Sequence, residues 1–160
     1  MPIEHVIVTD GADLPARVES AGGFGYAKRV VVPKAGNPVQ VAVMEIPPGR
    51  SAYPYHWHEV STEVYVVLSG RGVLRTPEGE REIAAGQVVV MPAGPAGAHR
   101  LHNPSATEPL RYVDVDTSSR IDVVHYPDAG KTATSRDDGE IIAFRDGDAV
   151  GYYEGEPDAG

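Results

Sequence analysis

Short hydrophobic runs separated by turn residues recur along most of this chain. The runs are rich in Val, Ile and Tyr, and 18 glycines and 14 prolines interrupt them throughout. No window of ordinary helix length carries apolar residues at helical spacing without a Gly or Pro break. The pattern predicts an all-β fold with strands over residues 26–32, 39–46, 62–69, 71–76, 87–92, 99–103 and 110–117. Short strands this closely spaced are typical of a sandwich or barrel.

The two ends of the chain differ from this strand-rich centre. Residues 1–25 are expected to form an N-terminal arm and residues 26–117 the barrel. From residue 118 the chain becomes more polar and turn-rich, with two candidate strands, IDVVHY and EIIAF. We expect residues 118–160 to pack on the barrel as an extension. Its end, which from Ala149 contains acidic residues and no Lys or Arg, is expected to be frayed.

Composition excludes several classes of site and partner. The chain has 160 residues, the length of a single domain, and no cysteine, so any metal must bind nitrogen or oxygen. A formal charge of −9, from 23 acidic and 14 basic residues, disfavours nucleic acid as a partner. No apolar stretch approaches the length of a membrane span, and the N-terminus lacks a signal-peptide pattern. We therefore expect a cytoplasmic protein that binds neither nucleic acid nor membrane.

The stretch YHWHEVSTE, residues 55–63, is the strongest candidate for chemistry. Side chains alternate between the two faces of a strand, so His56 and His58 share one face. An antiparallel return would bring Glu63 beside them, and Tyr65 shares the face of Glu63. Two imidazoles and a carboxylate in one place predict a metal site.

A fourth ligand would come from the stretch HRLHN, residues 99–103. In a regular strand His99 and Asn103 lie on one face and His102 lies on the other. His99 and His102 therefore cannot both reach the same metal. Aromatic residues near the first two histidines are expected to face away from the metal, toward a second layer or a partner chain: Tyr53, Tyr55 and Trp57.

The chain resembles the cupin superfamily in two ordered motifs, which read roughly G-x5-H-x-H-x3,4-E-x6-G and G-x5-P-x-G-x2-H-x3-N. The matching residues are Gly49, His56, His58, Glu63 and Gly70 in the first, and Gly86, Pro92, Gly94, His99 and Asn103 in the second. One extra residue follows Gly49, and four residues rather than two separate Gly94 from the histidine. The H-x3-N spacing favours His99 over His102, which would require Asn at Ala106.

This resemblance covers residues 26–117 and implies both fold and site. The implied fold is a single-domain double-stranded β-helix, or jelly roll. The implied cofactor is one divalent transition metal, Fe, Mn, Ni or Zn, and Tyr65 and Asn103 are candidates for substrate contact. The implied metal ligands are His56, His58, Glu63 and His99. A closer likeness, in the motifs YHWH, GPAGAH and YPD-x-GK, is to a functionally unassigned group of bacterial-type cupins.

Such a site predicts a small-molecule metalloenzyme. Three imidazoles and one carboxylate would leave two open positions on a six-coordinate ion, which suits dioxygenase-like or isomerase- and lyase-like chemistry. The alternative is a non-catalytic barrel that binds a sugar or a small acid. By analogy with similar barrels we expect a homodimer paired through sheet edges, with residues 26–32 as the donated strand.

Overall fold

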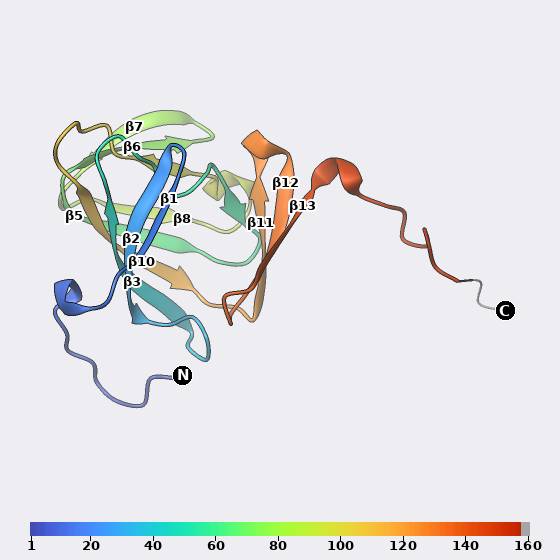
Figure 1. Ribbon diagram of the computed structural model, residues 1–160, viewed down its shortest axis with the longest axis horizontal. Coiled ribbons are helices and arrows are strands. Elements are labelled where there is room, and N and C mark those ends of the chain that lie inside the picture. The colour runs from blue at the N-terminus through green and yellow to red at the C-terminus, as the bar shows by residue number, and fades with distance from the viewer. Residues whose placement is uncertain (158–160) are drawn as a thin grey trace.

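The computed structural model describes residues 1–157, and almost all of its regular structure is β-strand (Figure 1). The strands are β1 (Arg17–Ala21), β2 (Phe24–Val32), β3 (Val39–Ile46), β4 (Trp57–His58), β5 (Glu63–Ser69), β6 (Arg71–Thr76), β7 (Gly79–Ala84), β8 (Val88–Met91), β9 (Arg100–His102), β10 (Leu110–Thr117), β11 (Ile121–Tyr126), β12 (Lys131–Arg136) and β13 (Ile141–Arg145). Short 3-10 turns are η1 (Gly11–Asp13), η2 (Pro95–Gly97), η3 (Pro127–Ala129) and η4 (Asp146–Asp148). The all-β prediction is confirmed.

Three antiparallel groups of strands form the barrel and its extension. The largest has the order β1-β2-β3-β10-β5-β8, the second β7-β6-β9, and the third β13-β12-β11-β4. Neighbours in the large sheet are far apart in sequence, since β10 lies between β3 and β5. This crossing order brings the second and the last strands of the predicted barrel, 39–46 and 110–117, into contact.

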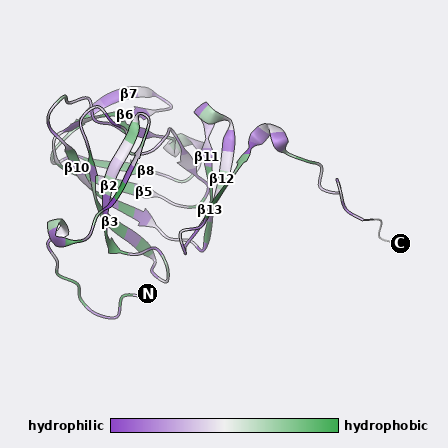
Figure 2. Ribbon diagram, viewed as in Figure 1, coloured by the Kyte–Doolittle hydropathy of each residue, from purple (hydrophilic) through white to green (hydrophobic). Residues whose placement is uncertain are grey.

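The core lies on the inner face of the large sheet. On β3 the alternate residues Ala42, Met44 and Ile46 are fully buried, and Tyr112 of β10 pairs in register with Met44 on one side and Val67 of β5 on the other. Hydrophobic and hydrophilic residues alternate along the strands in Figure 2. The two-residue period of a strand therefore produces one apolar face, and burial of that face is the main stabilising contribution.

The sequence predicted most strands of the described structure and missed four. Strands 39–46, 71–76, 110–117 and 121–126 agree residue for residue with β3, β6, β10 and β11. The missed strands are the two-residue β4 and the polar strands β1, β7 and β12, and each buries at most one residue in the described structure. Their strand form comes from backbone pairing with a neighbour, which hydrophobic periodicity does not reveal.

The predicted donor strand for a dimer is not a free edge. Strand β2 pairs with β1 on one side and with β3 on the other. The backbone groups of residues 26–32 are thus engaged within the chain, and β1 takes the edge position.

The C-terminal extension joins the barrel through β11. This strand pairs with β4, with Val124 opposite His58, and β12 and β13 continue the sheet outward. Figure 1 shows the chain running away from the barrel after β13. From Ala149 to residue 157 the residues are exposed, and residues 158–160 of the predicted frayed end lie outside the described residues. No helix within the described residues is long and apolar enough to cross a membrane.

Candidate metal centre

His56 is held by its backbone and by one ring nitrogen. Its amide donates to the carbonyl of His99 at 3.1 Å, and the amide of His99 donates back to His56 at 2.9 Å. The His56 Nδ1 lies 2.8 Å from the carbonyl oxygen of Pro54. A carbonyl only accepts, so Nδ1 carries the proton and the lone pair is on Nε2.

His58 is oriented by a carboxylate from the C-terminal extension. Its Nδ1 donates to Asp122 Oδ2 at 2.9 Å, and the amides of Val60 and Ser61 donate to the same carboxylate. Burial alone would raise the pKa of Asp122, but the hydrogen bond from His58 and those from the backbone outweigh it and hold the pKa well below its usual range. The ionised Asp122 therefore fixes the His58 tautomer with its lone pair on Nε2.

His99 is fixed in the same way by a tight turn. Its Nδ1 donates to the carbonyl oxygen of Gly97 at 2.9 Å, and its Nε2 lies 3.0 Å from the hydroxyl of Tyr65. A Cβ at Gly97 would lie 1.8 Å from the carbonyl oxygen of Pro92, so only glycine fits there. The sequence insertion between Gly94 and His99 thus forms η2, which ends at the glycine that holds the ring.

All three Nε2 atoms face one oxygen of Glu63. The distances to Glu63 Oε2 are 3.7 Å from His56, 3.6 Å from His58 and 3.1 Å from His99. Glu63 is 6% exposed, and the imidazoles offset the effect of burial on its pKa, which is lowered from its ordinary value. Burial lowers the pKa of His56 to about 4 although Glu63 opposes the shift, so this ring is neutral near pH 7.

The donor set suits a divalent transition metal. His56, His58 and Glu63 offer ligand atoms that all lie within 4.8 Å of one another. Neutral imidazole nitrogens and a carboxylate are ligands that Fe, Mn, Ni and Zn accept. The His99 Nε2 is close to Glu63 but is hydrogen-bonded to Tyr65, so it would join such a set only by releasing the Tyr65 hydroxyl.

The structure places the other two candidates differently. Tyr65 is 1% exposed, and its hydroxyl lies against the histidine group. Asn103 is fully buried, and its amide donates to the carbonyls of Ile46 and Glu108. Asn103 therefore links the end of β3 to the loop that precedes β10, and it does not line the cavity beside the histidines. His102 contacts Ser51 at 3.2 Å, away from that cavity.

A small cavity opens beside the histidines. Its volume is about 200 Å³. This is smaller than the usual pocket for a drug-sized ligand, which suits a small substrate. Residues from five strands line it together with three of the predicted ligands: Lys28, Lys34, Tyr53, His56, His58, Glu63, Asp114, Asp116, Val124, Tyr126, Ser135 and Ile141.

Several residues that line the cavity or orient its histidines were not predicted from the sequence. Asp114 and Asp116 alternate along β10 on the face that carries Tyr112, and this alternation was a usable signal. Asp122 gave no comparable signal, because it reaches His58 only through the pairing of β11 with β4. Tyr53 was predicted to face away from the metal, which is wrong, because residues 53–55 lie outside regular strand and strand alternation does not hold there.

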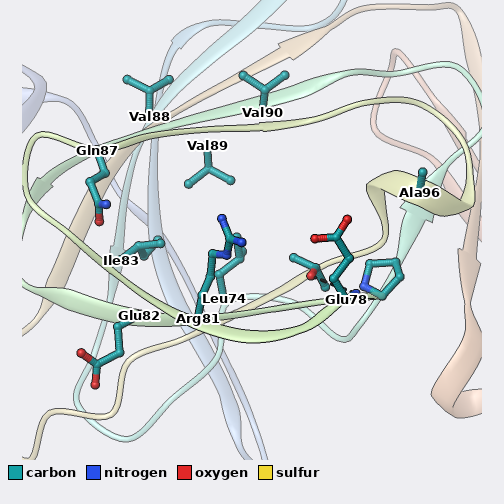
Figure 3. Close-up of a pocket in the computed structure, with 12 residues that line it drawn as sticks. Leu74, Glu78, Arg81, Glu82, Ile83, Gln87, Val88, Val89, Val90 and Ala96 are labelled. Carbon is teal, nitrogen blue, oxygen red and sulfur yellow. Dashed lines mark hydrogen bonds between the residues drawn. The ribbon is translucent and has the colours of Figure 1, made fainter.

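A larger hollow of about 700 Å³ lies elsewhere, between β6, β7 and β8. Figure 3 shows Val89 pointing into it while Val88 and Val90 point away. Within the described residues its lining contains no histidine, and its ionisable groups are Glu78, Arg81 and Glu82. This hollow is the larger of the two, but the histidines and Glu63 line the smaller one.

Comparisons with known proteins agree with this geometry. The family model of the cupin domain matches residues 42–116, the segment from β3 to β10. None of the curated proteins matches the chain significantly.

Three solved structures are similar over most of their length. A proposed sugar phosphate isomerase from Acidithiobacillus ferrooxidans is 25% identical, with a TM-score of 0.77 and coverage of 91% of this chain and 95% of that chain. A sugar phosphate isomerase from Silicibacter pomeroyi, named as a cupin, is 21% identical, with a TM-score of 0.77 and coverage of 91% and 98%. A predicted oxalate decarboxylase from Thermotoga maritima is 24% identical, with a TM-score of 0.62 and coverage of 71% and 100%.

The two motifs, the antiparallel jelly-roll sheets and these neighbours confirm the double-stranded β-helix. Residues 42–116 match the cupin domain, the fold is the one seen in solved cupins, and the chain carries a His56, His58 and Glu63 group able to bind a metal.

Proposed function

We propose that the chain is a metal-dependent enzyme that acts on a small molecule, with isomerase- or lyase-like chemistry in the cavity beside His56, His58 and Glu63. One observation carries the proposal. Each of three imidazoles, two buried and one half-buried, has its Nδ1 bonded to an acceptor and its Nε2 turned to the same Glu63 oxygen. This is how histidine ligands are usually oriented for a metal.

The proposed ligands are His56, His58 and Glu63, with His99 as the fourth once Tyr65 releases it. A divalent ion held there would supply a Lewis acid able to polarise a carbonyl oxygen of the substrate. The neutral rings and the single carboxylate would leave the site with a net positive charge. Asp114 and Asp116 stand on the cavity wall, where an isomerase requires groups that can exchange protons with the substrate.

The comparison with the Acidithiobacillus ferrooxidans protein supports the isomerase direction. That protein is named as a proposed sugar phosphate isomerase, and it is 25% identical to this chain over nearly its whole length. Dioxygenase-like chemistry at the same ligands is the competing possibility. It differs in consuming molecular oxygen, which a direct assay detects.

The first test is metal content. Protein purified without added metal should carry about one transition-metal ion per chain, and His58→Ala should lose most of it because one of its ligands is gone. The matched control is His5→Ala, since His5 is exposed. Metal content that is equal in wild type and His58→Ala would contradict the proposal.

The second test is turnover by the metal-loaded protein. Small aldose and ketose phosphates in D₂O should exchange hydrogen beside the carbonyl when followed by proton NMR, without oxygen uptake. Oxygen uptake would instead assign dioxygenase chemistry. Metal binding with neither activity over a broad set of substrates would favour the non-catalytic binding barrel.

A further inference from the structure

The outer face of the large sheet, opposite the core and the cavity, is made largely of valine. Side chains alternate along a strand, so the chain neighbours of the buried Met44, Tyr65 and Tyr112 point outward. Across β3, β10, β5 and β8 the outward residues form two rows in register: Val43, Val113, Val66 and Val88, and Val41, Val115, Val64 and Val90. Figure 3 shows Val88 and Val90 pointing away from the hollow that Val89 enters. We call these eight outward residues the valine face.

The valine face does not have the composition of a sheet surface in contact with water. An antiparallel sheet with one solvated face alternates apolar and polar residues, whereas strands that are apolar on both faces belong to sheets covered on both sides. Val88 and Val90 are each 61% exposed, so the β8 end of the face is open. The other six valines are partly buried beside their neighbours in the two rows. The pattern therefore indicates a surface that a partner covers.

The chain itself covers one corner of the valine face. Gly11 of η1 lies against Val43, since a Cβ on Gly11 would stand 2.6 Å from Val43 Cγ2. The arm that leads into η1, residues 4–10, lies outside the strands and 3-10 turns, and its Val6 and Val8 are each 93% exposed. Figure 1 shows this arm looping away from the barrel before η1. Two exposed apolar surfaces, the valine face and the arm, thus adjoin each other at η1.

The size of the face shows what a second copy of the chain would need. Strands lie about 4.8 Å apart and residues on one face about 6.8 Å apart, so the valine face covers roughly 260 Å². A specific interface needs about 500 Å² from each partner, which is about twice this area. An extended arm of seven residues is about 24 Å long, enough to cross all four strands. The arm can therefore supply a footprint of similar size.

The chemistry of the face favours a second copy over other partners. Its eight side chains are uncharged, and Arg111 and Glu45 at its border already pair with each other at 2.7 Å. A flat apolar sheet is complementary to another flat apolar sheet, and two such sheets pack about 10 Å apart. The net charge of −9 disfavours an anionic membrane surface. A two-fold axis makes one patch self-complementary and places each arm on the partner's sheet.

We infer that two copies of the chain form a two-fold dimer through the valine face, with the arm of each copy lying against the outer sheet of the other. The dimer uses a sheet face and the arm, and it leaves β2 paired within its own chain. The cavity lies on the inner side of the same sheet, so association and ligand binding use different surfaces. The inference goes beyond the proposed function and does not depend on it.

The test is sedimentation of the full chain at micromolar concentration, where the wild type should be a dimer. The double variant Val88→Lys with Val90→Lys should raise the dissociation constant at least about hundredfold, because four apolar side chains per dimer become buried charges. Lysine is common on edge strands, and β8 is an edge, so this variant should fold. The matched control is Val150→Lys, since Val150 is 69% exposed but lies outside the face.

A second double variant, Val6→Lys with Val8→Lys, tests the arm. It should raise the dissociation constant about tenfold or more, because the valine face alone is too small to hold the dimer. This variant changes no strand residue, so it decides the question even if the sheet variant fails to fold. Metal content should equal that of wild type in both variants, because neither touches the cavity.

Three results would overturn the inference. The first is a wild-type protein that stays monomeric at micromolar concentration. The second is a dimer whose dissociation constant is unchanged in either folded lysine variant, or is raised as much by the Val150→Lys control. The third is a monomer that binds vesicles of neutral lipid and loses this binding in the sheet variant, which would assign the valine face to a membrane.

Discussion

Replacement of Asp122 by asparagine should disable His58 as a metal ligand without changing the size of the side chain. Asp122 is fully buried and accepts four hydrogen bonds. Its Oδ2 accepts from His58 Nδ1 at 2.9 Å and from the Ser61 amide at 3.1 Å, and its Oδ1 accepts from the amides of Val60 and Val123 at 3.0 and 2.8 Å. An asparagine has only one acceptor oxygen, so its amide group must face two of these four donors in either orientation.

The consequence for His58 follows from its tautomer. If the amide group faces the ring, His58 Nδ1 can accept its hydrogen bond only after the ring proton moves to Nε2. The Nε2 atom then has no lone pair for a metal. Loss of the group that orients a histidine ligand typically costs about 10- to 100-fold in metal affinity, or about 1.4 to 2.7 kcal/mol. The stranded donors should also lower the free energy of unfolding by about 2–4 kcal/mol.

The assay is a competition for Zn²⁺ between the protein and a chromophoric chelator near neutral pH, with urea unfolding of the metal-free protein in parallel. Asp128→Asn is the matched control. Asp128 pairs with Arg75 at 2.6 Å on the surface, and exposed ion pairs contribute little. A folded Asp122→Asn protein that binds Zn²⁺ as tightly as wild type would refute the argument that Asp122 sets the His58 tautomer.

Two further predictions concern the stability of the metal-free protein. Burial lowers the pKa of His56 to about 4 in the folded protein, whereas the pKa of an unfolded histidine is about 6.5. Between these two pH values only the unfolded chain binds the proton. The free energy of unfolding should therefore fall by up to about 3 kcal/mol as pH drops from the higher value to the lower one. Urea unfolding at neutral pH and near pH 4 should show this loss of stability in wild type and a smaller loss in His56→Gln. Equal losses in the two proteins would contradict the assignment of the effect to His56. Gly97→Ala places a Cβ 1.8 Å from the Pro92 carbonyl oxygen, so the turn that holds His99 must shift. This variant should lower the free energy of unfolding by about 2–3 kcal/mol and should weaken Zn²⁺ binding. Gly147→Ala, where a Cβ meets nothing within 4 Å, is the control, and equal unfolding midpoints in the two variants would count against a tight fit at Gly97.

The strands that could be predicted from sequence are those with a buried face. In β3 and β10 the alternation of apolar residues identifies the strand, and Gly or Pro marks one of its ends. Polar strands such as β12, with Ala133 as its one buried residue, carry no such pattern and are defined by backbone pairing with β11 and β13. Pairing partners across more than a few residues are set by the whole fold, which local periodicity does not encode.

The same distinction explains which site residues were found. His56, His58 and Glu63 are close in sequence, so strand alternation and a short return were enough to bring them together. Asp122 lies 64 residues from His58 along the chain, and only the register of β11 against β4 brings it there. Tyr53 shows the opposite error, because alternation was extended into a segment that is not a strand.

The three imidazoles are oriented by three different parts of the chain, and this independence matters for the chemistry. His56 depends on the carbonyl of Pro54 just before it, His58 on a carboxylate of the C-terminal extension, and His99 on the turn η2. Each contact fixes a ring before any ligand arrives, so the site does not have to reorganise three side chains to bind a metal. Because one of these contacts comes from β11, the C-terminal extension is part of the site. Removal of the extension would take the Asp122 carboxylate away from His58 Nδ1 even if the barrel itself still folded.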